Sequence, residues 1–584
     1  MADILFINAV TSLSVNMEVN GTLLLATKLL EADFDTDVLR FAEVGLKKDY
    51  HLFIRKFVDK ILEFQPKAVS FYTLWPHYHI MLRIARVLKE ERPDIITVFG
   101  GPNASATAEA TMKAAPYIDY ICTGEGENTV VPFFQCILRE NGANKASIPG
   151  LYYRENGEIL HNTTELPLCD LNTLPHWDDR LYLKHYPLPD PNMAASNFYM
   201  PIDAGRGCPY NCTFCCSSYF WKRTYRLKSP ERILEDILFY NKKFGIRSFW
   251  FSHDAFTTNR QLVADVCDHL IATGLDIRWK CSARIDCITE ELILKMKQAG
   301  LTEIELGIET GSLKMQKLTN KNLNLERAKK MVAFMLEQKI YVSLFFMHGF
   351  PQENEQDLNE TLELLFSLVD SGVQHVGMFF CRFNPTTALT EEYLDRLVLD
   401  PNIKALTRGI YGYEEEFEII KENKAIFPYL YHLNTPERNT YQYLYLMVHV
   451  YRKFPKTARY LRKLYGGDHL RMYRDFYNNN LSCFEGDLMH AERFTETIPV
   501  QMLQNTLNGL DHPCVPQLKS LLKFEYDVLQ VTRSEEDTMV LETYDFNYID
   551  YRMNLPIEQY SQGKTEILIQ KTNGKTAMKV LSIT

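Results

Sequence analysis

Apolar and polar residues alternate along the first 135 residues in two different patterns. Short apolar runs such as 4–10 (ILFINAV) and 95–101 (IITVFGG) are separated by stretches with helical periodicity, for example 51–64 and 81–91. Short β-rich runs separated by helical stretches of roughly 10–15 residues are typical of a parallel sheet with helices on both faces. The pattern predicts a doubly wound, Rossmann-like α/β domain over residues 1–140.

The alternation stops after residue 140 and begins again near residue 200. Residues 141–199 are rich in proline and contain a predicted hairpin around Asn156 and Gly157, so we expect a linker there. Over residues 200–390 six strand–helix units follow one another. This succession predicts a (β/α)6 partial barrel, in which functional groups come from the carboxyl ends of the strands.

The remaining residues, 391–584, show mainly helical periodicity and end in β-rich runs at 538–546 and 565–570. We therefore expect a third, mainly helical domain. Because the first two domains carry the chemical motifs described below, this region is the predicted place of substrate selection. No catalytic motif stands out in it.

Composition narrows the possible classes of protein. The chain has 584 residues, 46% of them hydrophobic, and a net charge of −10, which argues against a general nucleic-acid-binding surface. No uncharged apolar run reaches the roughly 18 residues needed to span a membrane, and no basic, apolar signal sequence opens the chain. The thirteen cysteines are too sparse for a disulfide framework. We expect a cytoplasmic protein with no membrane or nucleic-acid partner.

Three closely spaced cysteines follow the first predicted strand of the barrel, in the segment Gly207-Cys208-Pro-Tyr-Asn-Cys212-Thr-Phe-Cys215. Three thiolates suit a [4Fe–4S] cluster whose fourth iron is open to a small molecule. A structural zinc site usually has four ligands, and the adjacent Cys216 is poorly placed to be the fourth. The spacing alone favours an iron–sulfur cluster but leaves zinc and chance open.

The position of this motif, with an aromatic residue before the third cysteine, resembles the radical S-adenosylmethionine (SAM) superfamily. The resemblance implies that Cys208, Cys212 and Cys215 bind a [4Fe–4S] cluster and that SAM binds the open iron through its amino and carboxylate groups. It also implies cleavage of SAM to a 5′-deoxyadenosyl radical, which abstracts hydrogen from the substrate. A flavodoxin- or ferredoxin-type protein would supply the electron.

Further residues of the barrel are implied as SAM contacts by the same resemblance. Phe214 would lie against the adenine or shield the cluster, and Asp254 or its loop would approach SAM. Ser282 and Arg284 would contact the carboxylate or ribose, since an arginine fork binds two oxygens at once. The alternative for Arg284 is an ion pair with Asp254 or Asp286.

The fourth and fifth strand segments complete the likeness. LGIETGS (306–312) places Glu309 where it would accept a hydrogen bond from a ribose hydroxyl or the SAM amine. MHGFPQEN (347–354) stands where the family usually has Gly-x-Pro-Gly-Glu-Thr. That departure keeps the predicted turn but weakens any role for Glu353.

A doubly wound domain ahead of such a barrel resembles the cobalamin-binding subfamily of radical SAM enzymes. Its ligand edge carries small and hydroxylated residues that let the backbone approach a bulky cofactor. These residues are Thr73, Gly100, Gly101, Ser105, Gly124 and Gly126. The resemblance implies bound cobalamin, with the nucleotide tail held by these loops.

The leading hypothesis is a C-methyltransferase that uses a [4Fe–4S] cluster, SAM and cobalamin on an unactivated carbon of a natural product or peptide. The second is an enzyme of the same architecture that catalyses cyclisation, rearrangement, epimerisation or crosslinking without methyl transfer. A third, from another class, is a non-catalytic iron–sulfur or zinc scaffold.

Overall fold

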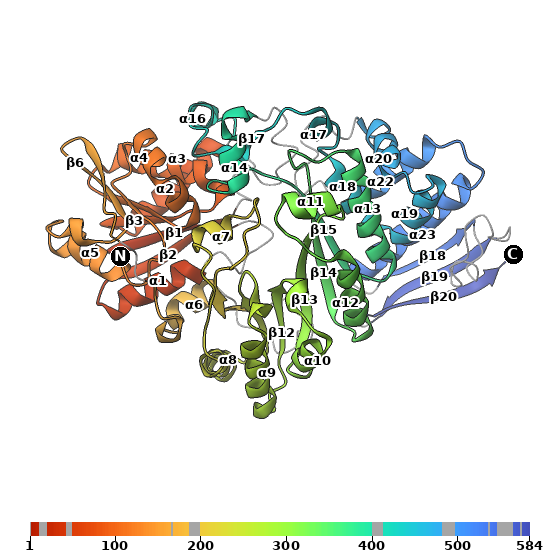
Figure 1. Cartoon of the computed structure of the whole chain (residues 1–584), viewed down its shortest axis with the longest axis horizontal. Coiled ribbons are helices and arrows are strands. Elements are labelled where there is room, and N and C mark those ends of the chain that lie inside the picture. Colours follow the sequence, from red (N-terminus) through yellow and green to blue (C-terminus); the bar gives the residue numbers. More distant parts are fainter. Residues whose placement is uncertain are drawn as a thin grey trace.

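The computed structural model describes residues 2–10, 20–42, 49–164, 168–185, 199–399, 413–481, 497–534, 538–545, 564–572 and 575–583. Along the long axis of the molecule the N-terminal domain, the barrel and the C-terminal helices follow one another (Figure 1). This order matches the order of the chain, except for one segment that returns to the first domain and is described below.

The N-terminal domain is built on a sheet whose first five strands are parallel, in the order β2-β1-β3-β4-β5. The strands are β1 (Ile4–Val10), β2 (Thr36–Ala42), β3 (Ala68–Tyr72), β4 (Ile96–Gly100) and β5 (Tyr120–Cys122). The helices are α1 (Asn20–Glu31), α2 (Tyr50–Glu63), α3 (Tyr78–Glu91), α4 (Pro102–Ala114) and α5 (Val130–Arg139). Helices α1 and α5 belong to one apolar core and α2, α3 and α4 to another, so both faces of the sheet are covered. The predicted doubly wound domain is confirmed.

The predicted hairpin forms, but it belongs to this sheet. Strands β6 (Leu151–Glu155) and β7 (Glu158–His161) join it antiparallel after β5, with Asn156 and Gly157 in the left-handed region at the turn. Part of the stretch expected to be a linker therefore extends the N-terminal sheet. Its other described residues include helix α6 (Asp179–His185) and Trp177, which packs against Tyr240 of the barrel domain.

The second domain is an open, six-stranded parallel sheet with the order β15-β14-β13-β12-β11-β8, as predicted for a partial barrel. Its strands are β8 (Met200–Asp203), β11 (Ser248–Ser252), β12 (Arg278–Ala283), β13 (Leu301–Glu309), β14 (Tyr341–His348) and β15 (His375–Phe380). The helices between them are α8 (Pro230–Phe244), α9 (Arg260–Thr273), α10 (Glu290–Gln298), α11 (Leu313–Leu318), α12 (Leu325–Glu337) and α13 (Glu355–Asp370).

Helix α8 shows how local sequence sets these elements. The Ser229 hydroxyl caps the first turn by accepting from the backbone N–H of Arg232, and Pro230 occupies a position that needs no N–H partner. Gly245 ends the helix in the left-handed conformation that glycine adopts at little cost. Each connection then returns the chain to the next parallel strand.

A short excursion interrupts the barrel after its first strand. Strand β9 (Gly205–Arg206), the cysteine loop and α7 (Cys216–Phe220) precede β10 (Arg226–Leu227), which pairs antiparallel with β9. In Figure 1 α7 lies between the N-terminal domain and the barrel. The cysteines are thus held at the junction of the two domains.

The C-terminal region divides into two parts. Its first part, with α14 (Ala388–Tyr393), β16 (Val398–Leu399), α16 (Phe417–Glu422) and β17 (Tyr431–His432), lies over the N-terminal domain in Figure 1. There Glu416 accepts a hydrogen bond from Tyr50, and Phe427 packs on Tyr78. This segment joins the third region to the first.

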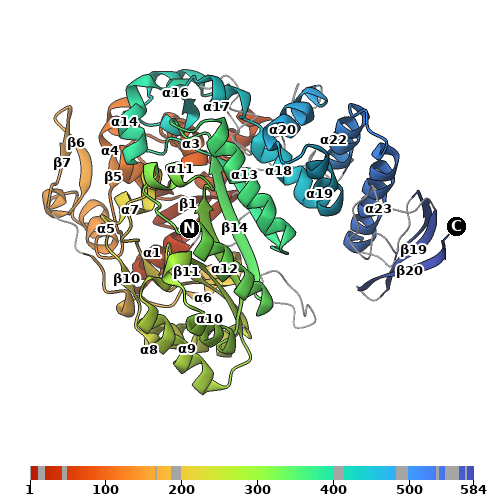
Figure 2. The same ribbon diagram turned by 45° about the vertical axis from the view of Figure 1, so that its right-hand side comes forward.

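The second part extends from the far side of the barrel (Figure 2). Its helices are α17 (Pro436–Thr440), α18 (Leu444–Lys453), α19 (Pro455–Leu464), α20 (His469–Asn478), α22 (Thr497–Asn508) and α23 (Val515–Arg533). A three-stranded antiparallel sheet of β18 (Met539–Tyr544), β19 (Thr565–Thr572) and β20 (Lys575–Ile583) packs against α23. Among the described residues, no helix is both long and apolar enough to cross a membrane.

Candidate cofactor and active site

Two cavities lie where the carboxyl ends of the N-terminal strands face those of the barrel. Their volumes are about 620 Å³ and about 980 Å³. Gly124 from the first domain, Phe220 and Trp221 from the cysteine excursion, and Asp254 from the barrel line both cavities. The two cavities therefore flank one shared wall at the junction of the domains.

The N-terminal side of this junction is held by neutral hydrogen bonds. The fully buried Thr73 hydroxyl donates to the carbonyl of Gly100 at 2.8 Å and accepts from the backbone N–H of Ala104 at 3.0 Å. The Ser105 hydroxyl accepts from the backbone N–H of Gly124 at 3.0 Å. Thr73 thus ties the loops after β3 and β4 together, while Ser105 also lines the larger cavity.

The predicted glycines line the smaller cavity, and two of them leave little room for a side chain. Gly100, Gly101, Gly124 and Gly126 all line the smaller cavity. A Cβ on Gly101, whose φ is +92°, would lie 3.1 Å from the backbone of Thr73. A Cβ on Gly126 would lie 3.1 Å from the Leu25 side chain. A larger residue at Gly101 would therefore meet the backbone of Thr73, and one at Gly126 would meet Leu25, which itself lines the smaller cavity.

The smaller cavity reaches deep into the N-terminal domain. Its lining includes apolar residues of the N-terminal domain such as Phe6 and Phe133, together with polar and charged residues such as Ser70, Glu127 and Arg206. A cleft that combines apolar walls with polar groups is the usual form of a site for a bulky organic ligand. It lies at the carboxyl edge of the parallel strands, where such sheets bind ligands.

The cysteine loop forms the opposite side of the junction. Cys208, Cys212 and Cys215 are all half-buried, and burial raises the pKa of the Cys215 thiol to about 11. A tetrahedral zinc ion would hold its thiolates about 2.3 Å away and hence roughly 3.8 Å from one another. In the described part of the chain, the one group of three or more potential ligand atoms within 4.8 Å of one another is Glu125, Glu127 and Cys169. Three thiols on one loop suit three different irons of a [4Fe–4S] cluster.

Arg284 lies beside this loop and connects it to the barrel. Its Nη1 donates to Cys212 Sγ at 3.7 Å, its Nε to Asp286 Oδ1 at 2.9 Å, and its Nη2 to the carbonyl of Lys321. The guanidinium also stacks on Tyr210, with 3.9 Å to the ring centroid. The ion pair with Asp286, one of the alternatives at the level of sequence, is confirmed. A contact between Arg284 and SAM stays a prediction.

Glu309 ends β13 next to a lysine that the sequence patterns did not indicate. Lys321 Nζ lies 3.0 Å from Glu309 Oε1, and both side chains are 11% exposed. Glu309 has a φ of +69°, a strained value for a residue with a Cβ. Burial acts to lower the pKa of Lys321, but the neighbouring Glu309 and Cys212 together outweigh it, so the pKa is raised. A second buried cation thus lies near the cysteine loop.

Asp254 and Ser282 are held by hydroxyl and carboxylate groups. Asp254 Oδ2 accepts from the Ser217 hydroxyl at 2.6 Å, and Asp254 itself is exposed to both cavities. The Ser282 hydroxyl donates to Glu305 Oε2 at 3.0 Å and lines the smaller cavity. Phe214 packs edge-on against Phe350 at 5.8 Å between ring centroids, so its contact in this structure is apolar.

Two family models match the chain, and they match its first two domains. The B12 binding domain model covers residues 9–133, and the Radical SAM superfamily model covers residues 202–365. The chain thus combines the two domains of cobalamin-binding radical SAM enzymes. Its cofactors are therefore a [4Fe–4S] cluster, SAM and cobalamin, and the predicted recognition, fold class and cofactors are confirmed.

Curated relatives match between half and two thirds of the chain. An uncharacterized methyltransferase of Pyrococcus horikoshii is 27% identical over 52% of this chain and 64% of its own length. An anaerobic magnesium-protoporphyrin IX monomethyl ester cyclase of Cereibacter sphaeroides is 26% identical over 64% of this chain and 63% of its own length. The chain thus spans less than two thirds of either relative.

Two solved structures resemble the model in fold. The radical SAM methyltransferase TsrM from Kitasatospora setae, solved with tryptophan and a SAM analogue, has a TM-score of 0.54 and 15% identity over 68% of this chain and 76% of its own. The cobalamin-dependent enzyme OxsB has a TM-score of 0.52 and 15% identity over 91% of this chain and 72% of its own. The second likeness extends over the C-terminal region as well.

The residues at the junction fit the three cofactors of the family. The cysteine loop offers three thiols, and Arg284, Lys321 and Glu309 offer both signs of charge for the amino and carboxylate groups of SAM. The apolar cleft behind the glycines suits the nucleotide tail of cobalamin. Sequence patterns missed Lys321 because nothing in the segment TNKN (319–322) marks it as buried.

Proposed function

We propose that this protein transfers the methyl group of SAM to an unactivated carbon of a small molecule or peptide. The single observation that carries the proposal is the pair of cavities between the two cofactor edges, both lined by Gly124 on one side and Asp254 on the other. When bound, the cluster and SAM supply a hydrogen-abstracting radical, and cobalamin supplies the methyl group. A substrate between the two edges would be within reach of both.

The charged residues beside Cys212 would bind and orient SAM. Lys321 has three donors, of which Glu309 uses one, so its ammonium can also bind a carboxylate. Glu309 can accept from an amine or hydroxyl with its second oxygen. Arg284, held by Asp286, provides a fixed positive charge at the same place. Burial strengthens each of these contacts because little water screens them.

The apolar walls would keep water away from the reacting groups. Trp221 and Phe220 line both cavities, and Trp250 of β11 lines the smaller one. Excluding water protects a radical from side reactions and holds the substrate in one orientation. A flavodoxin- or ferredoxin-type donor would supply the electron, and the C-terminal region would contribute to substrate selection.

The proposal is tested by following the methyl group of SAM. Reconstituted protein is incubated anaerobically with reductant, trideuteromethyl SAM and a small-molecule and peptide extract. Methyl transfer should give a product with the trideuteromethyl group and S-adenosylhomocysteine together with 5′-deoxyadenosine. Products without the label, accompanied by 5′-deoxyadenosine alone, would contradict it.

The second candidate is a radical cyclisation or rearrangement without methyl transfer. It is favoured by the match over 402 residues to a relative named as a magnesium-protoporphyrin IX monomethyl ester cyclase. The same experiment separates the candidates, because a cyclase would release 5′-deoxyadenosine and no S-adenosylhomocysteine.

A further inference from the structure

Two loops from different domains meet at the wall of the smaller cavity. Residues 123–127 follow β5 on the N-terminal edge, and Arg206 stands at the end of β9, before the cysteine loop. Arg206 Nη2 donates to Glu127 Oε1 at 2.7 Å, and Nη1 lies 3.4 Å from Glu125 Oε1. The exposed fractions of the side chains are 11% for Arg206, 7% for Glu127 and 5% for Glu125. The contact is therefore a buried, cross-domain charge cluster.

The barrel presents a second arginine at the same place. Arg226 lies directly opposite Arg206 in the β9–β10 ladder and donates to Glu125. Like charges directly opposite one another in a ladder are destabilising. Glu125 and Glu127, which come from the other domain, neutralise this pair. The ladder that begins the cysteine excursion is thus completed by the N-terminal domain.

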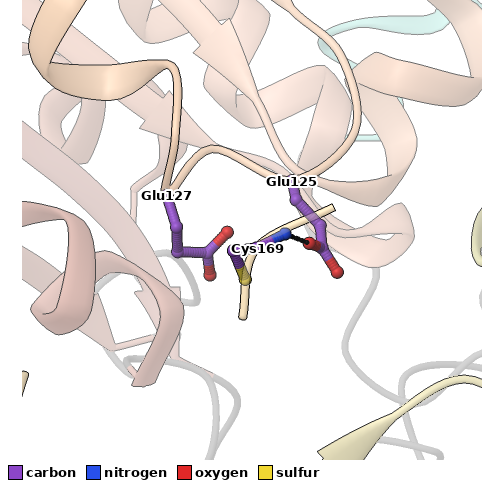
Figure 3. Close-up of side chains that lie close together, drawn as sticks. All are labelled: Glu125, Glu127 and Cys169. Carbon is purple, nitrogen blue, oxygen red and sulfur yellow. Dashed lines mark hydrogen bonds between the residues drawn. The ribbon is translucent and has the colours of Figure 1, made fainter. Parts of the chain in front are cut away.

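The segment that follows the N-terminal sheet in the chain, residues 168–185, contacts the same charge cluster through Cys169. Its backbone N–H donates to Glu125 Oε2 at 3.1 Å, as the dashed line in Figure 3 shows, and its Sγ accepts from Arg206 at 3.7 Å. Its carbonyl accepts from Arg226 at 2.9 Å. The grouping of Glu125, Glu127 and Cys169 meets the distances of a metal site. Because two guanidinium groups already occupy its carboxylates, it acts as a charge cluster.

We propose that Arg206, Glu125 and Glu127 are positioning residues that set the distance and orientation between the bound cobalamin and the iron–sulfur cluster. Glu125 follows Gly124, which lines both cavities, and Arg206 precedes Cys208 by two residues. A shift of this contact therefore moves both cofactor loops at once. The inference rests on the proposed function, since it takes both cofactors to be bound at these edges.

The test uses the full chain reconstituted with iron, sulfide and hydroxocobalamin, and compares wild type with Glu127→Gln. The substitution keeps the shape of the side chain but removes its charge. Arg206 then keeps Asp203 of its own domain, 2.9 Å from Nη2, but loses the shorter of its two ion pairs with the N-terminal domain. Cys169 is buried, and labelling of a buried group tracks the fraction of open molecules. We expect alkylation of Cys169, measured by peptide mass spectrometry, to be roughly tenfold faster or more in the variant.

A spectroscopic signature separates positioning from folding alone. Iron and cobalt content should be the same in wild type and in Glu127→Gln. The magnetic interaction between cobalt and the iron–sulfur cluster, measured by EPR, should weaken in the variant. Lys184→Ala is the matched control, because Lys184 forms a second inter-segment ion pair with Asp37 at 2.7 Å. That pair is 40% and 27% exposed, and exposed pairs contribute little. Both readouts should be unchanged in the control.

Three results would overturn the proposal: unchanged Cys169 labelling in Glu127→Gln, unchanged EPR interaction, or an equal response in Lys184→Ala. Arg206→Lys serves as a second variant, since it keeps the charge but loses the fork, and it should give an intermediate response. If both variants lose iron and cobalt, the charge cluster of Arg206, Glu125 and Glu127 is needed for folding alone, and the proposal fails. If wild type retains no cobalt, the proposed function fails instead, while the comparison of Cys169 labelling still decides the cross-domain role.

Discussion

The two edges that face each other across the cavities are built in opposite ways. On the N-terminal edge the loops are joined by neutral hydroxyls, those of Thr73 and Ser105, and by glycines. On the barrel edge Arg284, Lys321 and Glu309 lie buried beside the cysteine loop. The charges of the first edge, those of Glu125 and Glu127, are paired with Arg206 and Arg226, whereas the second edge has buried charged groups beside its cysteine loop.

The difference matches what each edge has to bind. A large organic cofactor gains most of its affinity from buried apolar area, and a charge left unpaired against it would be costly. SAM carries a positive sulfonium together with amino and carboxylate groups, so only a charged site can replace the water around them. The comparison predicts that SAM binding responds mainly to changes of charge on the barrel edge and cobalamin binding mainly to changes of shape on the N-terminal edge.

The largest expected effect is removal of the thiols. Changing Cys208, Cys212 and Cys215 together to alanine should abolish both iron binding and SAM cleavage, because no ligands for the cluster remain. Iron content and 5′-deoxyadenosine formation measure the two losses. Cobalamin retention should persist, since the N-terminal edge is intact.

Cys216→Ala is the control for this experiment. Cys216 is adjacent to the loop and half-buried, yet it stands outside the motif. It should leave about four irons per chain. Retention of four irons in the triple variant would contradict the assignment of this loop as the iron–sulfur cluster site.

A smaller effect is expected from the charged pair at the end of β13. Glu309→Gln removes a charged hydrogen bond, worth about 1.5–3 kcal/mol, which corresponds to a loss in SAM affinity of roughly tenfold or more. Arg284→Ala should weaken SAM binding in the same range. Equilibrium binding of SAM to the reconstituted variants measures both, with iron content as the control. Full SAM affinity in both variants would show that these charges serve the fold alone.

A still smaller effect is expected from Thr73→Val on the N-terminal edge. The variant loses the hydroxyl that joins Gly100 to Ala104, which should destabilise the ordered conformation of these loops by about 1–3 kcal/mol. Retention of hydroxocobalamin after desalting should fall several-fold, with iron content unchanged.

Thr97→Val provides the matched comparison for Thr73. Thr97 is equally buried and donates to the carbonyl of Tyr117 at 2.7 Å, but it lies near the amino end of β4, away from the cavities. It should lower thermal stability without lowering cobalamin retention. Equal loss of cobalamin in both variants would mean that retention reports only the stability of the domain.

The smallest effect concerns pH. Glu353 accepts from the backbone N–H of Gly349 at 2.5 Å, and burial raises its pKa to about 8. The usual value is about 4.3, so between the two values the folded chain holds a proton that the unfolded chain has lost. Stability should therefore fall as pH rises through this window, and Glu353→Gln should reduce that fall. Melting temperatures at about pH 5.5 and 8.5 test it, and identical pH dependence in both proteins would contradict it.

Much of this arrangement could be predicted from the sequence because it depends on residues that are close together in the chain. The alternation of strands and helices and the motif from Cys208 to Cys215 are local, and both α/β domains formed as expected. The place of the hairpin in the N-terminal sheet could not be predicted, since it depends on pairing with β5. The same holds for Arg206 and Lys321, whose partners are brought close only by folding. Gly101 shows a third case: it lines the smaller cavity, but the close neighbour that a Cβ there would meet, the backbone of Thr73, could not be read from the sequence.

The most direct test of the account is the metal content of anaerobically reconstituted wild-type protein, with SAM cleavage measured on the same sample. The protein is mixed with iron, sulfide and hydroxocobalamin, desalted, and assayed for iron and cobalt. The two facing edges predict about four irons and about one cobalt per chain, with 5′-deoxyadenosine formed under reductant. Protein that cleaves SAM but retains no cobalt would contradict the cobalamin edge, and with it the proposed methyl transfer.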